Sequence, residues 1–126
     1  MLGSHKLMAF VGVRDAARAR AFYRDTLGLN LIGEDGFALA FEVQGVRLRV
    51  TLVKEVQPHP YTALGWQVPD IVESARALEA AGVKLTRFEG LGQDELGIWT
   101  APGGAKIAWF QDPDGNILSV AQVERM

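Results

Sequence analysis

The sequence predicts an α+β fold made of two tandem βαβββ repeats. In each half of the chain, an apolar run is followed by an amphipathic helical pattern and then by extended segments. The helical patterns begin after Asp15 and Asp70 and end at Gly28 and Gly82. The distance along the chain from Asp15 to Asp70 is almost the same as the distance from Gly28 to Gly82. The length of 126 residues, with 48% hydrophobic and 22% charged residues, suits an ordinary globular domain. We therefore expect a single domain over residues 1–126.

The first repeat is expected over residues 7–54, and its first strand is the apolar run Leu7–Val13. Asp15 can cap the helix that follows because its short side chain accepts hydrogen bonds from free backbone amides. Gly28 can adopt the left-handed conformation that ends helices. The inward face of this helix is expected to carry Ala19, Phe22, Tyr23, Thr26 and Leu27. The extended segments that complete the repeat are residues 29–32, 37–42 and 47–54.

The second repeat is expected over residues 62–123 and follows the same order. Its first strand is Thr62–Val68. Asp70, with Glu73 three residues later, has the spacing of a capping box at a helix start, and Gly82 marks the helix end. The extended segments that follow are residues 83–88, 106–111 and 117–123.

The second repeat is longer than the first, and the additional residues fall in Glu89–Gly104. This stretch is rich in glycine and contains the sequence Pro-Gly-Gly near its end, which is typical of a loop. It is a candidate lid over a binding site, and a long solvated hairpin is the alternative. The candidate lid residues are Asp94, Glu95 and Trp99.

Composition limits the partners and the compartment. Thirteen Lys and Arg residues against fifteen Asp and Glu residues give a formal net charge of −2, so we expect no nucleic-acid partner. No apolar run approaches the length needed to span a bilayer, so no membrane partner is expected. The absence of cysteine excludes disulfides and thiolate metal sites and favours the reducing cytoplasm. The expected partner is a small organic molecule.

Two motifs agree with the repeat pattern. They are FYRDTLGL at Phe22–Leu29, which would end the first helix, and IAWFQDPDGNILSV at Ile107–Val120, which would form the last hairpin. With the two βαβββ repeats they resemble the vicinal oxygen chelate superfamily, which contains glyoxalase I, extradiol dioxygenases, fosfomycin-resistance enzymes and bleomycin-resistance proteins. The resemblance covers essentially the whole chain after the first few residues. It implies a cleft formed by curved mixed sheets, and a homodimer in which clefts are completed across the two-fold axis.

The resemblance also implies where a metal ion would bind. Metal-using members place one ligand on the first strand and one on the last strand of each repeat. Those positions correspond to Met8, Arg49, Ala63 and Ser119 in this sequence. None of the four is a histidine or a carboxylate, whereas a catalytic metal site needs about three firm protein ligands. We therefore expect no metal and no other cofactor.

Strand periodicity predicts which side chains line the cleft. The segment Arg47–Leu52 alternates polar and apolar residues, so its apolar side chains should enter the core and its polar ones the cleft. The same parity places Trp66 in the core. The expected ligand-binding residues are Met8, Phe10, Arg47, Arg49, Thr51, Ala63, Gln67, Trp109 and Ser119.

Two of these residues have competing interpretations. Arg49 offers a permanently charged, planar guanidinium that could hold a carboxylate, phosphate or enolate oxygen. The alternative is that Arg49 pairs with Glu42 or another acid and seals the cleft. Trp109 is equally suited to stack against a planar ligand and to simple packing.

Three functions remain open from the sequence. The first is metal-independent binding of an anionic or planar organic molecule, similar to the bleomycin-resistance branch. The second is a glyoxalase-like lyase, isomerase or dioxygenase that works by acid–base chemistry. Its proton-carrier candidates, none of which periodicity places in the cleft, are Glu42, Asp94, Glu95 and Tyr61. The third is an interaction subunit whose cleft is filled.

Overall fold

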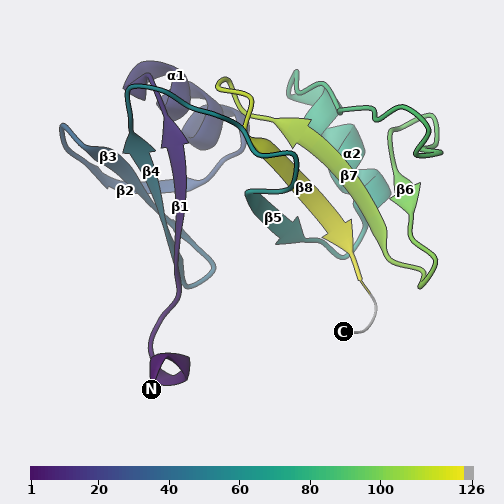
Figure 1. The fold of residues 1–126 in the computed structure, drawn as a ribbon, viewed down its shortest axis with the longest axis horizontal. Coiled ribbons are helices and arrows are strands. Elements are labelled where there is room, and N and C mark those ends of the chain that lie inside the picture. Colours follow the sequence, from purple (N-terminus) through teal and green to yellow (C-terminus); the bar gives the residue numbers. More distant parts are fainter. Residues whose placement is uncertain (124–126) are drawn as a thin grey trace. The chain divides into compact units, whose positions relative to one another are not determined.

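The computed structural model describes residues 1–123, which form two compact units, Met1–Gln57 and the part of Pro58–Met126 that is described. Residues 124–126, the last three of the expected domain, lie outside the described residues. Each unit contains one four-stranded mixed sheet and one helical segment between its first and second strands (Figure 1). The prediction of an α+β fold with two tandem βαβββ repeats is confirmed.

The first unit begins with a short 3₁₀ turn, η1, followed by the elements of the first repeat. The strand order in its sheet is β1-β4-β3-β2, with β1 parallel to β4 and the other pairs antiparallel. We call this the first sheet. The elements are η1 (Leu2–Ser4), β1 (Met8–Val13), α1 (Ala16–Arg20), η2 (Ala21–Thr26), β2 (Asn30–Glu34), β3 (Ala38–Val43) and β4 (Val46–Leu52).

The helical segment of the first unit starts as predicted and then widens. The Asp15 carboxylate accepts hydrogen bonds from the second and third backbone amides that follow it, so Asp15 caps α1. The sequence predicts a continuous α-helix, but from Ala21 onward the helix is a π-helix, η2. The Leu27 amide therefore bonds to the Phe22 carbonyl, five residues earlier, at 2.9 Å. Gly28, with φ of 75°, then ends the segment as predicted.

The second unit repeats this topology. The strand order in its sheet, the second sheet, is β5-β8-β7-β6, again with the first and last strands of the repeat parallel. Asp70 caps α2 through hydrogen bonds from two backbone amides, and Gly82 with φ of 86° follows its end. No helix within residues 1–123 is long and apolar enough to cross a membrane. The elements are β5 (Leu64–Gln67), α2 (Ile71–Ala80), β6 (Trp99–Thr100), β7 (Lys106–Gln111) and β8 (Ile117–Gln122).

One predicted strand is wrong. Residues 83–88 do not form a strand, and only Thr86 pairs with β7, through an isolated bridge to Trp109. The strand that pairs with the other end of β7 is β6, Trp99–Thr100, which lies inside the segment predicted to be a loop. The additional residues of the second repeat therefore interrupt the edge of the sheet, and do not simply follow a complete edge strand.

The side chain of Gln93 gives the physical reason for this difference. Its Nε2 donates to the Thr86 carbonyl at 2.9 Å and to the Gly97 carbonyl at 2.8 Å. Its Oε1 accepts from the Phe88 amide at 2.7 Å. Backbone groups that would extend the pairing with β7 are thus bonded to a side chain, which competes with the strand ladder.

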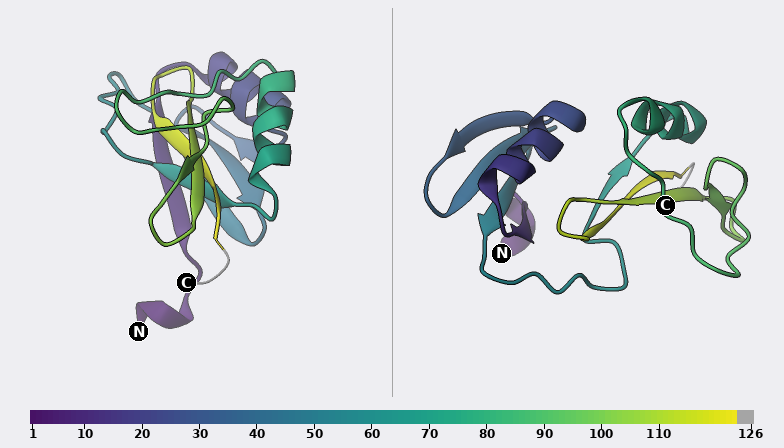
Figure 2. Two further views of the ribbon diagram at one scale, coloured as in Figure 1. Left: turned by 90° about the vertical axis from the view of Figure 1, so that its right-hand side faces the viewer. Right: turned by 90° about the horizontal axis from the view of Figure 1, so that it is seen from above.

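Each unit has its own core between the sheet and the helical segment (Figure 2). Phe41 and Phe110 occupy equivalent positions in the two repeats and are both fully buried. Tyr23 of η2 lies against Phe41, with ring centroids 6.1 Å apart. Trp66 stacks on Phe110 with centroids 6.3 Å apart, so its predicted packing role is confirmed.

Candidate functional site

One face of the first sheet packs on the helical segment, and the opposite face, here called the open face, carries the predicted cationic residues. Leu48 and Val50 of β4 are buried, at 3% and 0% exposure. Because successive side chains of a strand point to opposite faces, Arg47, Arg49 and Thr51 lie on the open face.

The adjacent strand β1 adds apolar side chains to the open face. The parallel register pairs Met8 with Arg47 and Phe10 with Arg49. Met8 is 46% exposed and Phe10 is 59% exposed. Large apolar side chains exposed side by side are typical of a surface that binds another molecule. The first unit thus brings together Met8, Phe10, Arg47, Arg49 and Thr51 from the predicted set.

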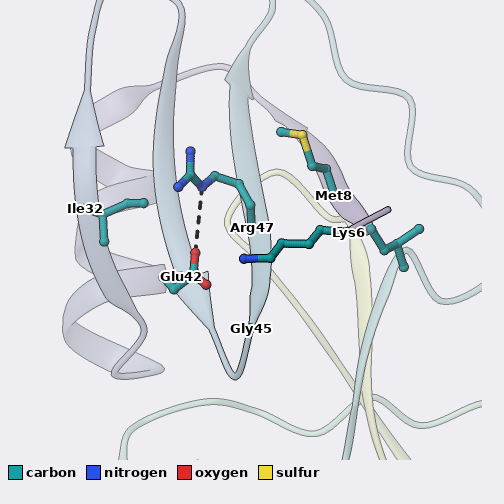
Figure 3. Close-up of a pocket in the computed structure, with 7 residues that line it drawn as sticks. Lys6, Met8, Ile32, Glu42, Gly45 and Arg47 are labelled. Carbon is teal, nitrogen blue, oxygen red and sulfur yellow. Dashed lines mark ion pairs between the residues drawn. The ribbon is translucent and has the colours of Figure 1, made fainter. Parts of the chain in front are cut away.

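A cavity of about 510 Å³ opens beside the hairpin that joins β3 to β4 (Figure 3). Two of its lining residues, Met8 and Arg47, belong to the predicted set. A cavity of this size can accept a small organic ligand. Its lining residues are Lys6, Leu7, Met8, Ile32, Glu42, Gly45 and Arg47.

Sequence reasoning missed Lys6 and Ile32 as cavity residues. Lys6 lies two residues before Met8, so period-two alternation extended backwards from β1 was a signal that could have found it. Ile32 had no such signal, because the pairing of β2 with β3 shifts register between Leu31 and Gly33. A bulge of this kind changes which face a side chain occupies.

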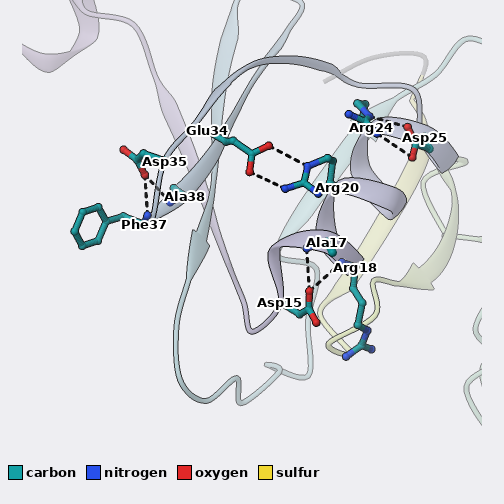
Figure 4. Close-up of polar contacts among 10 residues, drawn as sticks. All are labelled: Asp15, Ala17, Arg18, Arg20, Arg24, Asp25, Glu34, Asp35, Phe37 and Ala38. Atoms are coloured by element: carbon teal, nitrogen blue, oxygen red, sulfur yellow. Dashed lines mark hydrogen bonds and ion pairs between the residues drawn. The ribbon is translucent and has the colours of Figure 1, made fainter.

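Arg49 is half-buried, and its guanidinium makes no hydrogen bond or ion pair with any of residues 1–123. The expected alternative partner, Glu42, lies against Arg47 instead, with its Oε2 atom 3.7 Å from Arg47 Nε. The charge of Arg49 acts on the Asp35 carboxyl group. Its pKa is lowered mainly by hydrogen bonds from the Phe37 and Ala38 amides, at 2.8 and 3.0 Å, and to a smaller extent by the charge of Arg49 (Figure 4).

A two-bond ion pair holds the helical segment to the sheet edge. Arg20 Nε and Nη2 donate to the two carboxylate oxygens of Glu34 at 2.9 and 2.7 Å (Figure 4). These hydrogen bonds lower the pKa of Glu34 and raise that of Arg20. Because Glu34 pairs with buried Leu39, this contact belongs to the helix-covered side and not to the open face.

In the second sheet, the predicted residues lie around Ser119. The register pairs Ser119 with Gly65 on one side and with Trp109 on the other. Ser119 is 7% exposed, and its Oγ accepts a hydrogen bond from Thr62 Oγ1 at 3.2 Å. A Cβ atom at Gly65 would lie 3.1 Å from the same oxygen. Ser119 is therefore enclosed by its own unit. Ala63 and Gln67, on the parity of Gly65, are exposed.

Trp109 contacts two other aromatic rings. Its ring meets Phe88 edge-on, with centroids 5.3 Å apart and an interplanar angle of 87°. Trp99 of β6 lies on it with centroids 6.1 Å apart. These contacts account for Trp109 through packing within the second unit, which is one of the two interpretations that the sequence left open.

Two of the three candidate lid residues, Asp94 and Glu95, are held by hydrogen bonds within their own loop, and the third, Trp99, lies on β6. The Asp94 carboxylate accepts hydrogen bonds from the Leu96 and Ile98 amides, both at 2.9 Å. Arg87 donates to the backbone carbonyls of Asp94 and Glu95 at 2.7 and 2.6 Å. The Asp94 side chain is thus a structural group of this loop.

The family model for the Glyoxalase/Bleomycin resistance protein/Dioxygenase superfamily matches residues 5–120 of the chain. The chain belongs to this superfamily. Among curated proteins, none matches the sequence significantly.

Solved structures of superfamily members have the same fold. A member of the superfamily from Sphaerobacter thermophilus aligns with a TM-score of 0.73 at 23% identity, over 95% of this chain and 98% of that chain. Lactoylglutathione lyase from Agrobacterium tumefaciens aligns with a TM-score of 0.72 at 19% identity, over 94% and 93%. A glyoxalase/bleomycin resistance protein/dioxygenase from Alicyclobacillus acidocaldarius gives 0.69 at 19% identity, over 97% and 93%. At these identities the likeness establishes the fold alone.

The residues that the resemblance assigns to the metal positions do not fit a divalent cation. Met8, Arg49, Ala63 and Ser119 supply no imidazole and no carboxylate, and Arg49 adds a positive charge. Within residues 1–123, no group of three or more His, Cys, Asp or Glu side chains is placed to hold a metal ion.

Proposed function

We propose that this member of the superfamily binds a small organic anion on the open face of the first sheet, without a metal ion. The observation that carries the proposal is Arg49, whose half-buried guanidinium has no acceptor among residues 1–123 and lies beside an exposed phenyl ring. A guanidinium in this state can form two parallel hydrogen bonds to a carboxylate or phosphate.

The apolar neighbours support an organic ligand over a bare inorganic anion. Phe10 is paired with Arg49, and Met8 lies two residues before it on the same face. A ligand with an apolar or planar body would cover these exposed side chains while its anionic group contacts Arg49. The cavity beside Met8 provides a concave surface on the same sheet.

Native mass spectrometry of the protein purified from its own cells tests the proposal. We expect a retained small molecule with at least one acidic group. The Arg49→Ala variant should weaken its binding by about 1.5 to 3 kcal/mol, the range for a hydrogen bond to a charged group. Arg76→Ala, which removes an exposed arginine of α2, is the matched control. Unchanged affinity in Arg49→Ala, together with a large drop in melting temperature, would show that Arg49 has a structural role and would contradict the proposal.

A glyoxalase-like acid–base enzyme is the second candidate, and one observation favours it. Of the proton carriers considered from the sequence, Glu42 lines the cavity of the first unit. Asp94 is bonded within its loop, and Tyr61 is 62% exposed and stacks on His59. If the protein is an enzyme, Glu42→Gln should abolish turnover of the retained molecule while its binding persists. Turnover that survives Glu42→Gln would reject this role for Glu42.

A further inference from the structure

We infer that the cavity beside the β3–β4 hairpin is a binding site for small amphipathic monocarboxylates. This inference goes beyond the proposed function, because its site is a different part of the open face of the first sheet. The site is centred on Lys6 and Arg47 and not on Arg49.

The charge of the cavity favours a single anionic group. Lys6 and Arg47 contribute two positive charges and Glu42 contributes one negative charge, which leaves one positive charge uncompensated. A monoanion would neutralise this charge. A dianion such as a phosphate monoester would place its second charge near the Glu42 carboxylate, which repels it.

The cationic groups also have free hydrogen-bond donors. Lys6 makes no side-chain hydrogen bond or ion pair with any of residues 1–123. The only ion pair of the Arg47 side chain within residues 1–123 is with Glu42, and the 3.7 Å distance between Nε and Oε2 is too long for a hydrogen bond. The guanidinium of Arg47 can therefore turn its planar edge to a carboxylate, whose two oxygens match it. Figure 3 shows Lys6, Glu42 and Arg47 around the same cavity.

The remaining wall of the cavity is apolar and exposed. Leu7, Met8 and Ile32 are 75%, 46% and 46% exposed. They come from β1, its lead-in and β2, so the apolar surface spans both sides of the cationic groups (Figure 3). A hydrocarbon chain or an aryl ring attached to the carboxylate would remove this surface from water, which an isolated small anion cannot do.

Hexanoate is a suitable probe, with acetate, 1-hexanol and inorganic phosphate as comparison compounds. Binding is followed by chemical-shift changes of backbone amides in ¹⁵N-labelled protein. We expect hexanoate at millimolar concentration to shift the amides of residues 6–8, 32 and 42–47. Acetate lacks the apolar body and 1-hexanol lacks the charge, so each should bind at least about tenfold more weakly than hexanoate. Phosphate should leave these amides unchanged.

Four variants of the cavity lining, with one control on α2, separate this site from a general surface effect. Lys6→Gln and Arg47→Gln should each weaken hexanoate binding by about tenfold, whereas Arg76→Gln on α2 should not change it. Glu42→Gln should strengthen it by about threefold, because the competing carboxylate is removed. Ile32→Ser should weaken hexanoate and leave acetate unchanged.

Several outcomes would overturn the inference. They are the absence of hexanoate binding, amide chemical-shift changes confined to other parts of the chain, or a hexanoate affinity of Lys6→Gln and Arg47→Gln equal to that of the wild type. The proposed function is judged separately, by the effect of Arg49→Ala on the molecule retained from cells. If Arg49→Ala weakens binding of that molecule while Lys6→Gln and Arg47→Gln leave hexanoate affinity unchanged, the proposed function stands and this inference fails. If Arg49→Ala leaves binding of the retained molecule unchanged while Lys6→Gln and Arg47→Gln weaken hexanoate binding, this inference stands and the proposed function fails.

Discussion

Phe10 and Arg49 lie side by side in the parallel pairing of β1 with β4, on the open face of the first sheet. The phenyl ring is 59% exposed, and the guanidinium has no hydrogen-bond acceptor among residues 1–123. A ligand could remove the exposed ring from water and supply the guanidinium with a hydrogen-bond acceptor. Their adjacency is why we place an organic anion at this point.

The geometry of the Arg49 contact can be tested with Arg49→Lys. Lysine keeps the positive charge but loses the planar fork that can bond both oxygens of a carboxylate. A bidentate contact should therefore lose about tenfold or more in affinity for the molecule retained from cells, measured by isothermal titration calorimetry. Thermal unfolding of the same variant controls for folding. Affinity equal to that of the wild type would show that only the charge of Arg49 matters.

Metal independence has its own test. We predict that dialysed protein titrated with nickel, zinc, manganese or ferrous ion shows no stoichiometric binding tighter than about micromolar, because the four superfamily positions carry no imidazole or carboxylate. Isothermal titration calorimetry with each ion, and elemental analysis of the unbound protein, check this prediction. Tight one-to-one binding that Ser119→Ala removes would contradict it.

The local signals in the sequence were sufficient for most of the fold. Asp15 and Asp70 cap their helices, and Gly28 and Gly82 end them, through contacts within a few residues of chain. The alternation of polar and apolar residues along Arg47–Leu52 is also a local pattern, and it predicts which side chains of β4 lie on each face of the sheet. Such short-range rules need no knowledge of the distant partner, so sequence reasoning could apply them directly.

The errors come from contacts that the local pattern does not contain. Residues 83–88 have the composition of a strand. The Thr86 carbonyl and the Phe88 amide, however, form hydrogen bonds with the side chain of Gln93, which lies further along the chain. The face occupied by Ile32 depends on a register shift between two strands. The sequence does not determine the partner of Arg49, because ion pairing depends on side-chain geometry. In the structure, Glu42 lies against Arg47. Each miss therefore reflects competition between partners and not a wrong periodicity.

The loop before β6 offers a stability test. Gln93→Ala removes hydrogen bonds to the Thr86 and Gly97 carbonyls and from the Phe88 amide. We predict faster amide hydrogen exchange in residues 86–98 and a change in Trp99 fluorescence, with exchange in α2 unaltered. Gln111→Ala, at an exposed glutamine of β7, is the control. Wild-type exchange in the Gln93 variant would mean that the loop is held by its other contacts.

The same loop can be tested as a lid. If the segment Glu89–Gly104 closes over a ligand, binding of the molecule retained from cells should slow amide exchange in it and alter Trp99 fluorescence. The internal hydrogen bonds of Asp94 already order this segment, so we expect the change to be small and confined to its glycine-flanked ends. Exchange that ligand leaves untouched would make the segment a connector.

The assembly of the protein can also be tested. We expect a homodimer, because the strands β1 and β2 lie at the edges of the first sheet and β1 exposes Met8 and Phe10. Size-exclusion chromatography with light scattering at micromolar concentration should therefore give about twice the 13.7 kDa mass of the chain. A clean monomer at that concentration would contradict the prediction and would leave the open face to small ligands alone.

The Arg20–Glu34 ion pair makes stability depend on acid pH. Hydrogen bonds from Arg20 lower the pKa of Glu34 in the folded state. A carboxyl whose pKa is lowered by folding stabilises the protein above its ordinary pKa, and this contribution disappears as the pH falls through the lowered value. Glu34→Gln should therefore reduce the free energy of unfolding at neutral pH and have progressively less effect as the pH falls below about 4. Urea denaturation at several pH values measures both, with Glu79→Gln on α2 as the control for loss of one carboxylate. A difference between wild type and Glu34→Gln that stays constant from neutral pH into strong acid would show that the carboxylate charge contributes nothing through Arg20.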